Sequence, residues 1–127
     1  MAKIIECVPN ISEGRNHEVI EACVDTVRNT AGVTLLDYSS DASHNRSVIT
    51  FMGSPEGVMN AATALAKKAA ELIDLNHHQG EHPRMGAVDV IPLIPLKDVT
   101  QEATVEYSKQ LAERIWNEAG LPIFLYE

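Results

Sequence analysis

The stretch Arg46-Ser47-Val48-Ile49-Thr50-Phe51-Met52-Gly53-Ser54-Pro55-Glu56 leads from a strand straight into a helix and sets the layout of the chain. Its first part is rich in β-branched and aromatic residues, which predicts a strand over residues 46–52. The residues after Met52 predict a helix start, with Ser54 as N-cap, Pro55 at the first helical position and an acid in the first turn. The Ala-rich, amphipathic run that follows, as far as Ile73, favours a helix packed closely on a sheet.

The part of the chain before this stretch begins with a strand and a helix. Residues 3–8 form a β-rich run that ends at Pro9. Because proline cannot donate to a sheet ladder, we expect residues 10–15 to form a loop that leaves the end of this strand. From Asn16 onward, apolar residues recur at helical spacing until Gly32 ends the run.

The remaining elements follow from the same kinds of signal. Further strands are expected at residues 33–37, 87–94 and 123–126. Residues 38–45 are polar and predict a loop, and Pro92 indicates an edge strand or a bulge near the end of its strand. Thr100 is a candidate N-cap for a third helix that runs to about Ala119.

The order of these elements predicts an α/β chain of the two-layer α+β sandwich type. Its first six elements match a ferredoxin-like βαββαβ core, to which one helix and one strand are added. In such a fold we expect the helices to pack on one face of a mixed sheet. A length of 127 residues fits one domain, which covers residues 1–127.

Composition and charge exclude several classes of function. The net charge is −8 and the chain has no basic run, so nucleic acid is not expected as a partner. Glu6 and Pro9 interrupt the N-terminal apolar run and no apolar run approaches the length of a membrane span, so we expect a cytoplasmic protein without a membrane partner. Cys7 and Cys23 fall in a predicted strand and on the apolar face of a predicted helix, as expected for small core residues rather than a disulfide or zinc framework.

The segment His77-His78-Gln79-Gly80-Glu81-His82-Pro83-Arg84-Met85-Gly86 carries the chemistry. Its glycines and proline break any regular repeat, so its polar side chains are not one face of a helix or strand. Imidazole titrates near neutral pH and responds to nearby charges, which favours a proton-transfer site. The alternative is a polar surface loop that happens to be rich in histidine.

His78 to His82 also spell H-x-x-E-H, the pattern of an inverted zinc metalloprotease. That pattern works on a helix, where residues four apart share a face and bind one ion. Gly80 inside the pattern and Pro83 directly after it disfavour helical geometry. We therefore expect no metal site.

Several of these segments together resemble one family. Glu6-Cys7-Val8-Pro9-Asn10-Ile11-Ser12-Glu13-Gly14-Arg15, Asn45-Arg46-Ser47, and His77 to Gly86 with Ala87-Val88-Asp89 closely match the N-terminal subdomain of the formiminotransferase domain, of the glutamate formimidoyltransferase and formimidoyltransferase-cyclodeaminase family. The resemblance runs over essentially the whole chain in the same order and spacing.

The resemblance implies a transferase of one-carbon metabolism that acts in histidine degradation. It would move the formimino group from N-formimino-L-glutamate to tetrahydrofolate, which serves as a co-substrate. The position of the family's proposed general acid/base is His82 here. A single imidazole suits the reaction, because the attacking nitrogen must lose a proton and the departing glutamate nitrogen must gain one.

Other residues of the matched segments have candidate roles in binding the two substrates. Arg46 and Arg84 would hold carboxylates through paired hydrogen bonds, or form surface ion pairs. Glu81 would orient His82 or be solvated. The remaining candidates are Asn10 and Asn45, which would bind ligand or brace a turn, and Asp37.

One departure from the family pattern bears on the donor. The better-known animal members carry an Asp two positions after the one that matches Asp37, whereas this chain has Ser39, with Asp41 displaced by two. The role of that acid would pass to one of these three residues, and a formyl donor would fit the residues nearly as well.

The resemblance also concerns only one half of a two-subdomain catalytic unit, whose substrate site lies between the subdomains. A missing C-terminal subdomain and a homo-oligomer are therefore expected partners. The alternative from another class is a stand-alone subdomain that binds folate or another chain without turnover.

Overall fold

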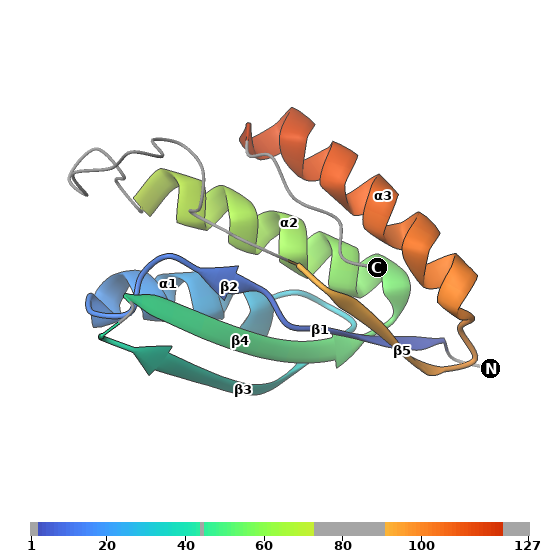
Figure 1. Cartoon of the computed structure of the whole chain (residues 1–127), viewed down its shortest axis with the longest axis horizontal. Helices are drawn as coiled ribbons and strands as arrows, with labels where there is room; N and C mark the ends of the chain where they lie inside the picture. Colours follow the sequence, from blue (N-terminus) through green and yellow to red (C-terminus); the bar gives the residue numbers. More distant parts are fainter. Residues whose placement is uncertain (1–2, 44, 73–90, 121–127) are drawn as a thin grey trace.

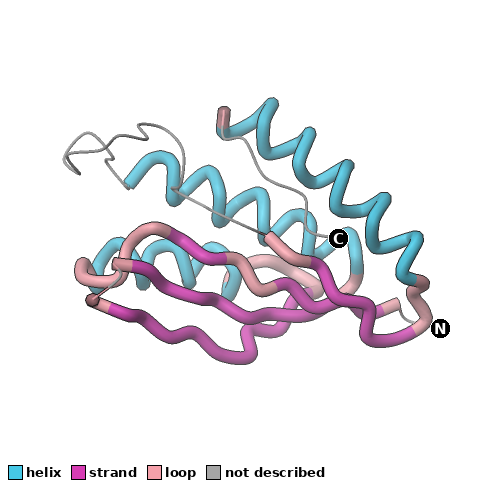
Figure 2. Tube along the Cα trace, viewed as in Figure 1, coloured by secondary structure: helices cyan, strands magenta, loops and turns pink. Residues whose placement is uncertain are grey.

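A computed structural model describes residues 3–43, 45–72 and 91–120 and arranges them as a sheet with helices on one face (Figures 1 and 2). The strands are β1 (Ile4–Cys7), β2 (Asn10–Ile11), β3 (Val33–Asp41), β4 (Arg46–Gly53) and β5 (Leu93–Lys97). The helices are α1 (His17–Arg28), α2 (Pro55–Leu72) and α3 (Gln101–Ala119). The expected α+β sandwich and its added third helix are confirmed, whereas the strand expected at residues 123–126 lies outside the described residues.

The sheet places β4 between β3 and β1, and β5 pairs with the far edge of β1. Every pairing between the described strands is antiparallel, so the expected mixed sheet is wrong for this part of the chain. The reason lies in the helical connections. The one through α1 joins β1 to β3 with β4 between them, and the one through α2 joins β4 to β5 with β1 between them. Strands of the same direction are therefore never neighbours.

Residues 10–15 were expected to be a loop, but the first two form β2. β1 and β2 pair with the same edge of β4 in a single register, with Cys7 opposite Phe51 and Asn10 opposite Val48. Pro9 lacks an N–H, yet its carbonyl oxygen accepts a hydrogen bond from the amide of Ile49 at 3.0 Å. The ladder thus continues past the proline because only its donor is missing.

The polar loop expected at residues 38–45 begins too early, because β3 runs on to Asp41. This strand lies at the edge of the described sheet, and its polar residues pair with β4, so that Ser40 lies opposite Ser47 with their hydroxyl oxygens 2.9 Å apart. The bounds of the strand expected at residues 87–94 are wrong where the structure describes them, because Ile91 and Pro92 are not in a strand and β5 starts at Leu93 and includes Pro95. Residues 87–90 lie outside the described residues. Within the described strands β5 is an edge strand, where a proline is tolerated.

All three expected helix starts are confirmed. The side chain of Asn16 accepts hydrogen bonds from two first-turn amides of α1, and Thr100 accepts one from Ala103 in α3. The hydroxyl of Ser54 accepts from the amide of Gly57 at 3.0 Å, and Pro55 begins α2. α3 ends at Gly120, whose φ of 70° lies in the left-handed region.

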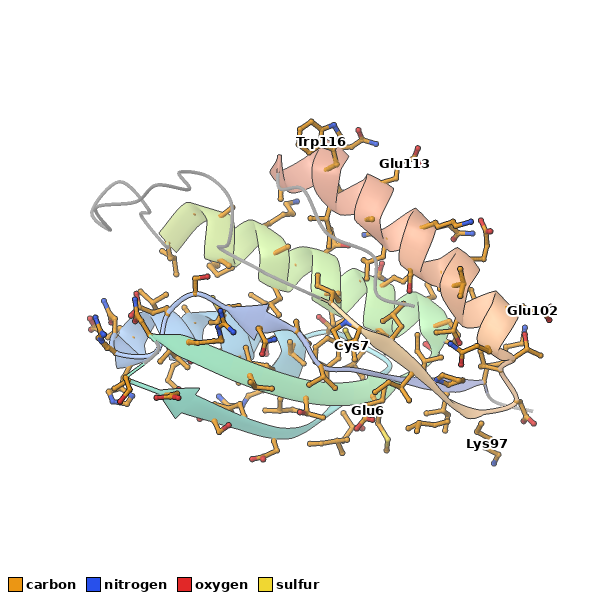
Figure 3. The ribbon with its side chains drawn as sticks, viewed as in Figure 1. Glu6, Cys7, Lys97, Glu102, Glu113 and Trp116 are labelled. Carbon is orange, nitrogen blue, oxygen red and sulfur yellow. The ribbon has the colours of Figure 1, made fainter. Side chains whose placement is uncertain are left out.

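Alternation along the strands separates a core face from an open face. Ile5, Cys7, Ile49 and Phe51 are fully buried under the helices. The side chains of Glu6 and Cys7 leave β1 on opposite sides (Figure 3). On the side of Glu6, no helix of the described residues covers the sheet (Figure 1). None of the helices in the described residues is long and apolar enough to cross a membrane.

We predict that Gly53→Ala destabilises the fold. A Cβ at this position would collide with the backbone carbonyl of Gly32 and lie 3.0 Å from the Cα of Val33, so β3 would have to move away from β4. Forcing extra volume into a packed site costs about 1–3 kcal/mol, and contact with backbone atoms favours the upper end. Urea unfolding measures the loss.

The matched control is Gly120→Ala, where an added Cβ meets nothing within 4 Å in the described part of the chain and the left-handed backbone is penalised by roughly 1 kcal/mol. A Gly53→Ala protein as stable as this control would contradict the close approach of β3 to β4.

Candidate functional site

The open face of the sheet brings together three of the expected substrate-binding residues. Asn10 in β2 lies opposite Val48, and Asp37 in β3 lies opposite Thr50. Directly opposed residues share a face, and the next positions on β4, Ser47 and Ile49, are buried in the core. Arg46, directly before Ser47, therefore also belongs to the open face. Residues up to 36 positions apart in sequence thus meet on one surface.

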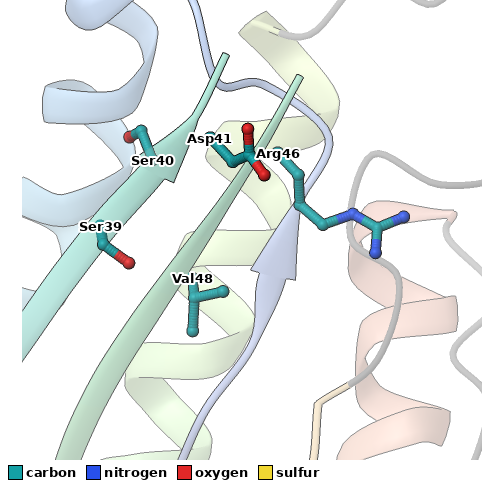
Figure 4. A pocket seen from close by; sticks show the side chains of 5 residues that line it. All are labelled: Ser39, Ser40, Asp41, Arg46 and Val48. Carbon is teal, nitrogen blue, oxygen red and sulfur yellow. The ribbon is translucent and has the colours of Figure 1, made fainter. Parts of the chain in front are cut away.

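A pocket of about 320 Å³ opens at the end of this face (Figure 4). It is lined by Ser39, Ser40, Asp41, Arg46 and Val48, from β3 and β4. The side chain of Arg46 extends from β4 toward the β2 side of the sheet (Figure 4). The pocket therefore combines a guanidinium group, a carboxylate and the hydroxyl of Ser39, which suits a small polar ligand that carries both charge signs.

Asp41, the acid displaced by two positions from the family pattern, lies on the same side of β3 as Asp37. Asp37, Ser39 and Asp41 alternate along β3 and lie opposite Thr50, Val48 and Arg46. Because successive side chains of one face are about 7 Å apart along a strand, Ser39 is flanked on both sides by a carboxylate. Asp37 and Asp41 are both exposed on this face.

Asn45 braces a turn. Its backbone is left-handed, with φ 53°, a conformation that asparagine tolerates better than most residues. Its side-chain oxygen Oδ1 accepts a hydrogen bond from the amide of Gly14 at 2.9 Å. This contact accounts for one of the two roles expected of Asn45, and its role toward a ligand stays a prediction.

Ser47, which sequence reasoning did not single out, provides a second brace. Its side chain is fully buried, and its hydroxyl donates to the carbonyl oxygen of Glu13 at 2.5 Å. The signal for it was a serine on the core side of a strand whose other inward residues are Ile49 and Phe51. A buried hydroxyl there must have a partner.

The loop of residues 12–15 is thereby attached to the turn between β3 and β4. The carboxylate of Glu13 accepts from the amides of Arg15 and Asn16 at 3.1 and 3.0 Å. The guanidinium Nε of Arg15 donates to the carbonyl oxygen of Ala42 at 2.8 Å. The matched segments around Gly14 and Arg46 thus form one connected structure.

His82, Glu81 and Arg84 lie outside the described residues, so their expected roles stay predictions. The chain returns to the described part at Ile91, and the carbonyl oxygen of Pro92 accepts from the amide of Val8 at 3.3 Å. Val8 lies between β1 and β2, two residues before Asn10, so Pro92 is bonded to the residues that link these two strands.

The two cysteines are buried core residues. Both cysteines are free and buried, which confirms the expectation of core residues. Burial raises the pKa of Cys7 far above its ordinary range, and raises the pKa of Cys23 to about 11. Since the thiolate is the nucleophile and the metal ligand, neither sulfur is activated.

Residues 4–127 match the family described as the formiminotransferase domain, N-terminal subdomain. The chain is 60% identical over 127 residues to a glutamate formimidoyltransferase of Streptococcus pyogenes serotype M1, and the alignment covers 100% of this chain and 42% of that protein. It is 45% identical over 123 residues to a glutamate formimidoyltransferase of Thermoplasma acidophilum, in an alignment that covers 97% of this chain and 41% of that protein. A formimidoyltransferase-cyclodeaminase of Gallus gallus is 49% identical over 126 residues, in an alignment that covers 99% of this chain and 23% of that protein. The chain thus spans less than half the length of these relatives.

We predict that the protein binds no structural or catalytic metal. Within residues 3–43, 45–72 and 91–120, no group of three or more His, Cys, Asp or Glu residues could hold an ion. The remaining histidines of the H-x-x-E-H pattern fall on a segment broken by Gly80 and Pro83. Elemental analysis after mild chelation should find no stoichiometric zinc, and the unfolding midpoint should not change.

His78→Ala serves as the control, since it removes a required ligand of that pattern and should leave metal content unchanged. Zinc bound one to one, lost together with stability or activity on chelation, would favour the metalloprotease pattern instead.

Proposed function

Because the chain belongs to the formiminotransferase family, as its N-terminal subdomain, we propose that it forms one wall of the active site of a glutamate formimidoyltransferase. The reaction is the transfer of the formimino group from N-formimino-L-glutamate to tetrahydrofolate. The observation that carries this proposal is the gathering of Asn10, Asp37 and Arg46 on the open sheet face.

The chemistry of this face fits both substrates. Each of them carries carboxylates, and Arg46 offers the planar, permanently charged group that binds carboxylates in pairs of hydrogen bonds. The acids Asp37 and Asp41 suit a cationic formimino group. Val8, Val48 and Met52 are half-buried on the same face and provide apolar surface for the flat ring of tetrahydrofolate.

His82 is proposed as the general acid/base. It would take a proton from the attacking nitrogen and then give one to the departing glutamate nitrogen. Glu81 would orient its imidazole, and Arg84 would bind a second substrate carboxylate. The hydrogen bond from Val8 to Pro92 supports this arrangement, because Pro92 is ten residues after His82 in sequence and Val8 is two residues before Asn10.

A second subdomain is proposed as the other wall. The chain covers 42% of the Streptococcus pyogenes protein, and the sheet face that no described helix covers carries the candidate binding residues. Holding a folate nitrogen against the amidine carbon requires contacts from both sides. We also propose a homo-oligomer, since apolar side chains such as Ile94, 39% exposed, remain on this face.

We infer that the core is ferredoxin-like. The order β3-β4-β1-β5 and the two helical connections that each cross over one strand support this topology.

Ser39 favours a second candidate, a transferase that uses a formyl donor. A neutral formamide needs no acid at this position, whereas a cationic amidine benefits from one. Parallel assays of the full reading frame with N-formimino-L-glutamate and with N-formyl-L-glutamate, each with tetrahydrofolate, distinguish them by which donor releases glutamate.

We predict that His82→Ala in the full-length enzyme lowers kcat about 10²- to 10⁴-fold, the usual contribution of a positioned acid/base. The unfolding midpoint should stay near that of the wild type. His77→Ala is the matched control and should keep most activity. A His82→Ala enzyme within about threefold of wild type would assign the proton transfer to another group.

We also predict that residues 1–127 fold alone but do not catalyse alone. Folding is expected because the helices and strands already enclose a core with Ile5, Phe51, Leu65 and Ile115 fully buried. Catalysis is not expected because the chain offers a single wall of the site. Circular dichroism checks the first part, and glutamate release from both substrates checks the second. Steady turnover at the rate of the full-length enzyme would overturn the two-wall arrangement.

A further inference from the structure

We propose that Asn45 and Ser47 are positioning residues, which hold Arg46 in place on the open sheet face by fixing it to the loop of residues 12–15. The inference rests on the proposed function, because it takes Arg46 as the group that binds a substrate carboxylate. It adds a role for Asn45 and Ser47 that requires no contact of these residues with the substrate.

The two braces enclose Arg46 on both sides along the chain. The residue before it, Asn45, accepts from the amide of Gly14 at 2.9 Å. The residue after it, Ser47, donates to the carbonyl of Glu13 at 2.5 Å. Both partners are backbone groups of consecutive residues, so the loop holds the peptide units on either side of Arg46 at once.

Gly14 lets this contact form. A Cβ on Gly14 would lie 2.5 Å from the backbone nitrogen of Arg46, 2.8 Å from its carbonyl oxygen and 2.5 Å from the carbonyl oxygen of Asp41. The loop backbone therefore lies directly against the backbone of Arg46, with no side chain between them. Any displacement of Arg46 in this direction meets the loop itself.

The loop that holds Arg46 is itself fixed at two places. The carboxylate of Glu13 accepts from the amides of Arg15 and Asn16, and Asn16 caps the first turn of α1. Arg15 donates to the carbonyl of Ala42 in the turn between β3 and β4. The brace is thus anchored to a helix on one side and to a hairpin on the other.

The position of Arg46 explains why bracing matters. It is the first residue of β4, directly after a turn whose last residue, Asn45, has a left-handed backbone. Movement of this turn would move the backbone of Arg46, and its side chain with it. Since a displacement of about 1 Å weakens a binding interaction strongly, holding the backbone of Arg46 should show in substrate affinity.

The test uses matched variants of the full-length enzyme. Asn45→Gly keeps the left-handed backbone but removes the acceptor for Gly14, whereas Asn45→Asp keeps an acceptor oxygen. Ser47→Ala removes the second brace with little change in volume. Arg46→Ala identifies which substrate Arg46 binds, by the KM that it raises.

For that substrate we expect Asn45→Gly and Ser47→Ala each to raise KM about 3- to 10-fold with kcat within about twofold, as for a loss of uniform binding. Asn45→Asp should stay close to wild type. In the Arg46→Ala background, Asn45→Gly should add nothing, because residues that act through one another are not additive. A further rise in KM there, or an equal rise in Asn45→Asp and Asn45→Gly, would mean that Asn45 contacts the substrate itself, and would overturn the proposal.

A measurement without substrate separates this proposal from the proposed function. In enzyme labelled with ¹⁵N-arginine, the order parameter of the Arg46 Nε–Hε group should fall in Asn45→Gly and Ser47→Ala and not in Asn45→Asp. Unchanged order in all variants would overturn the positioning role, even if the enzyme is active. A wild-type enzyme that releases no glutamate from either donor would instead contradict the proposed function, and leaves this readout intact.

Discussion

The pairing of β4 along both of its edges is the constraint on which the rest of the structure depends. One edge of β4 pairs with β3, and the other edge pairs with β1 and β2 in a single register. The positions of these three strands relative to one another therefore depend on β4. Its inward residues Ile49 and Phe51 lie at the centre of the core, and its first residue is Arg46. A shift of one residue in either pairing would move Arg46 to the core side and Ser47 to the open side.

The same pairing joins stability to the candidate site. Ser47 is buried among apolar residues and yet supports the loop that carries Gly14. The inward residues of β4 therefore pack under the helices, and the residues at its N-terminal end fix the candidate binding surface. This explains how a surface of exposed polar residues keeps a defined geometry without a cover from the described helices.

Local features were predictable from the sequence, and features that depend on distant partners were not. Ser54 and Thr100 were recognised as caps because a cap bonds within its own first turn, whereas Asn16 was recognised only as the start of a helical repeat. Pro9 was taken as the end of a strand, because nothing nearby reveals that Ile49 donates to its carbonyl. The polar end of β3 was taken as a loop for a similar reason, since its strand character comes from pairing with β4. In the candidate site, Asn10 and Arg46 were identified as candidates from the matched segments, but that they share a face follows only from the strand order. The brace from Asn45 to Gly14 was not predictable because it joins residues 31 positions apart.

The bulge in β3 has a consequence for how copies of the protein meet. It interrupts the register between Leu35 and Asp37, and leaves Leu36 46% exposed at the edge of the described sheet. An incoming strand from another molecule would face a broken ladder, with the carboxylates of Asp37 and Asp41 close by. A second β3 would bring the same acids, and like charges across a strand pair repel. This edge therefore resists the strand-to-strand recruitment that leads to aggregation.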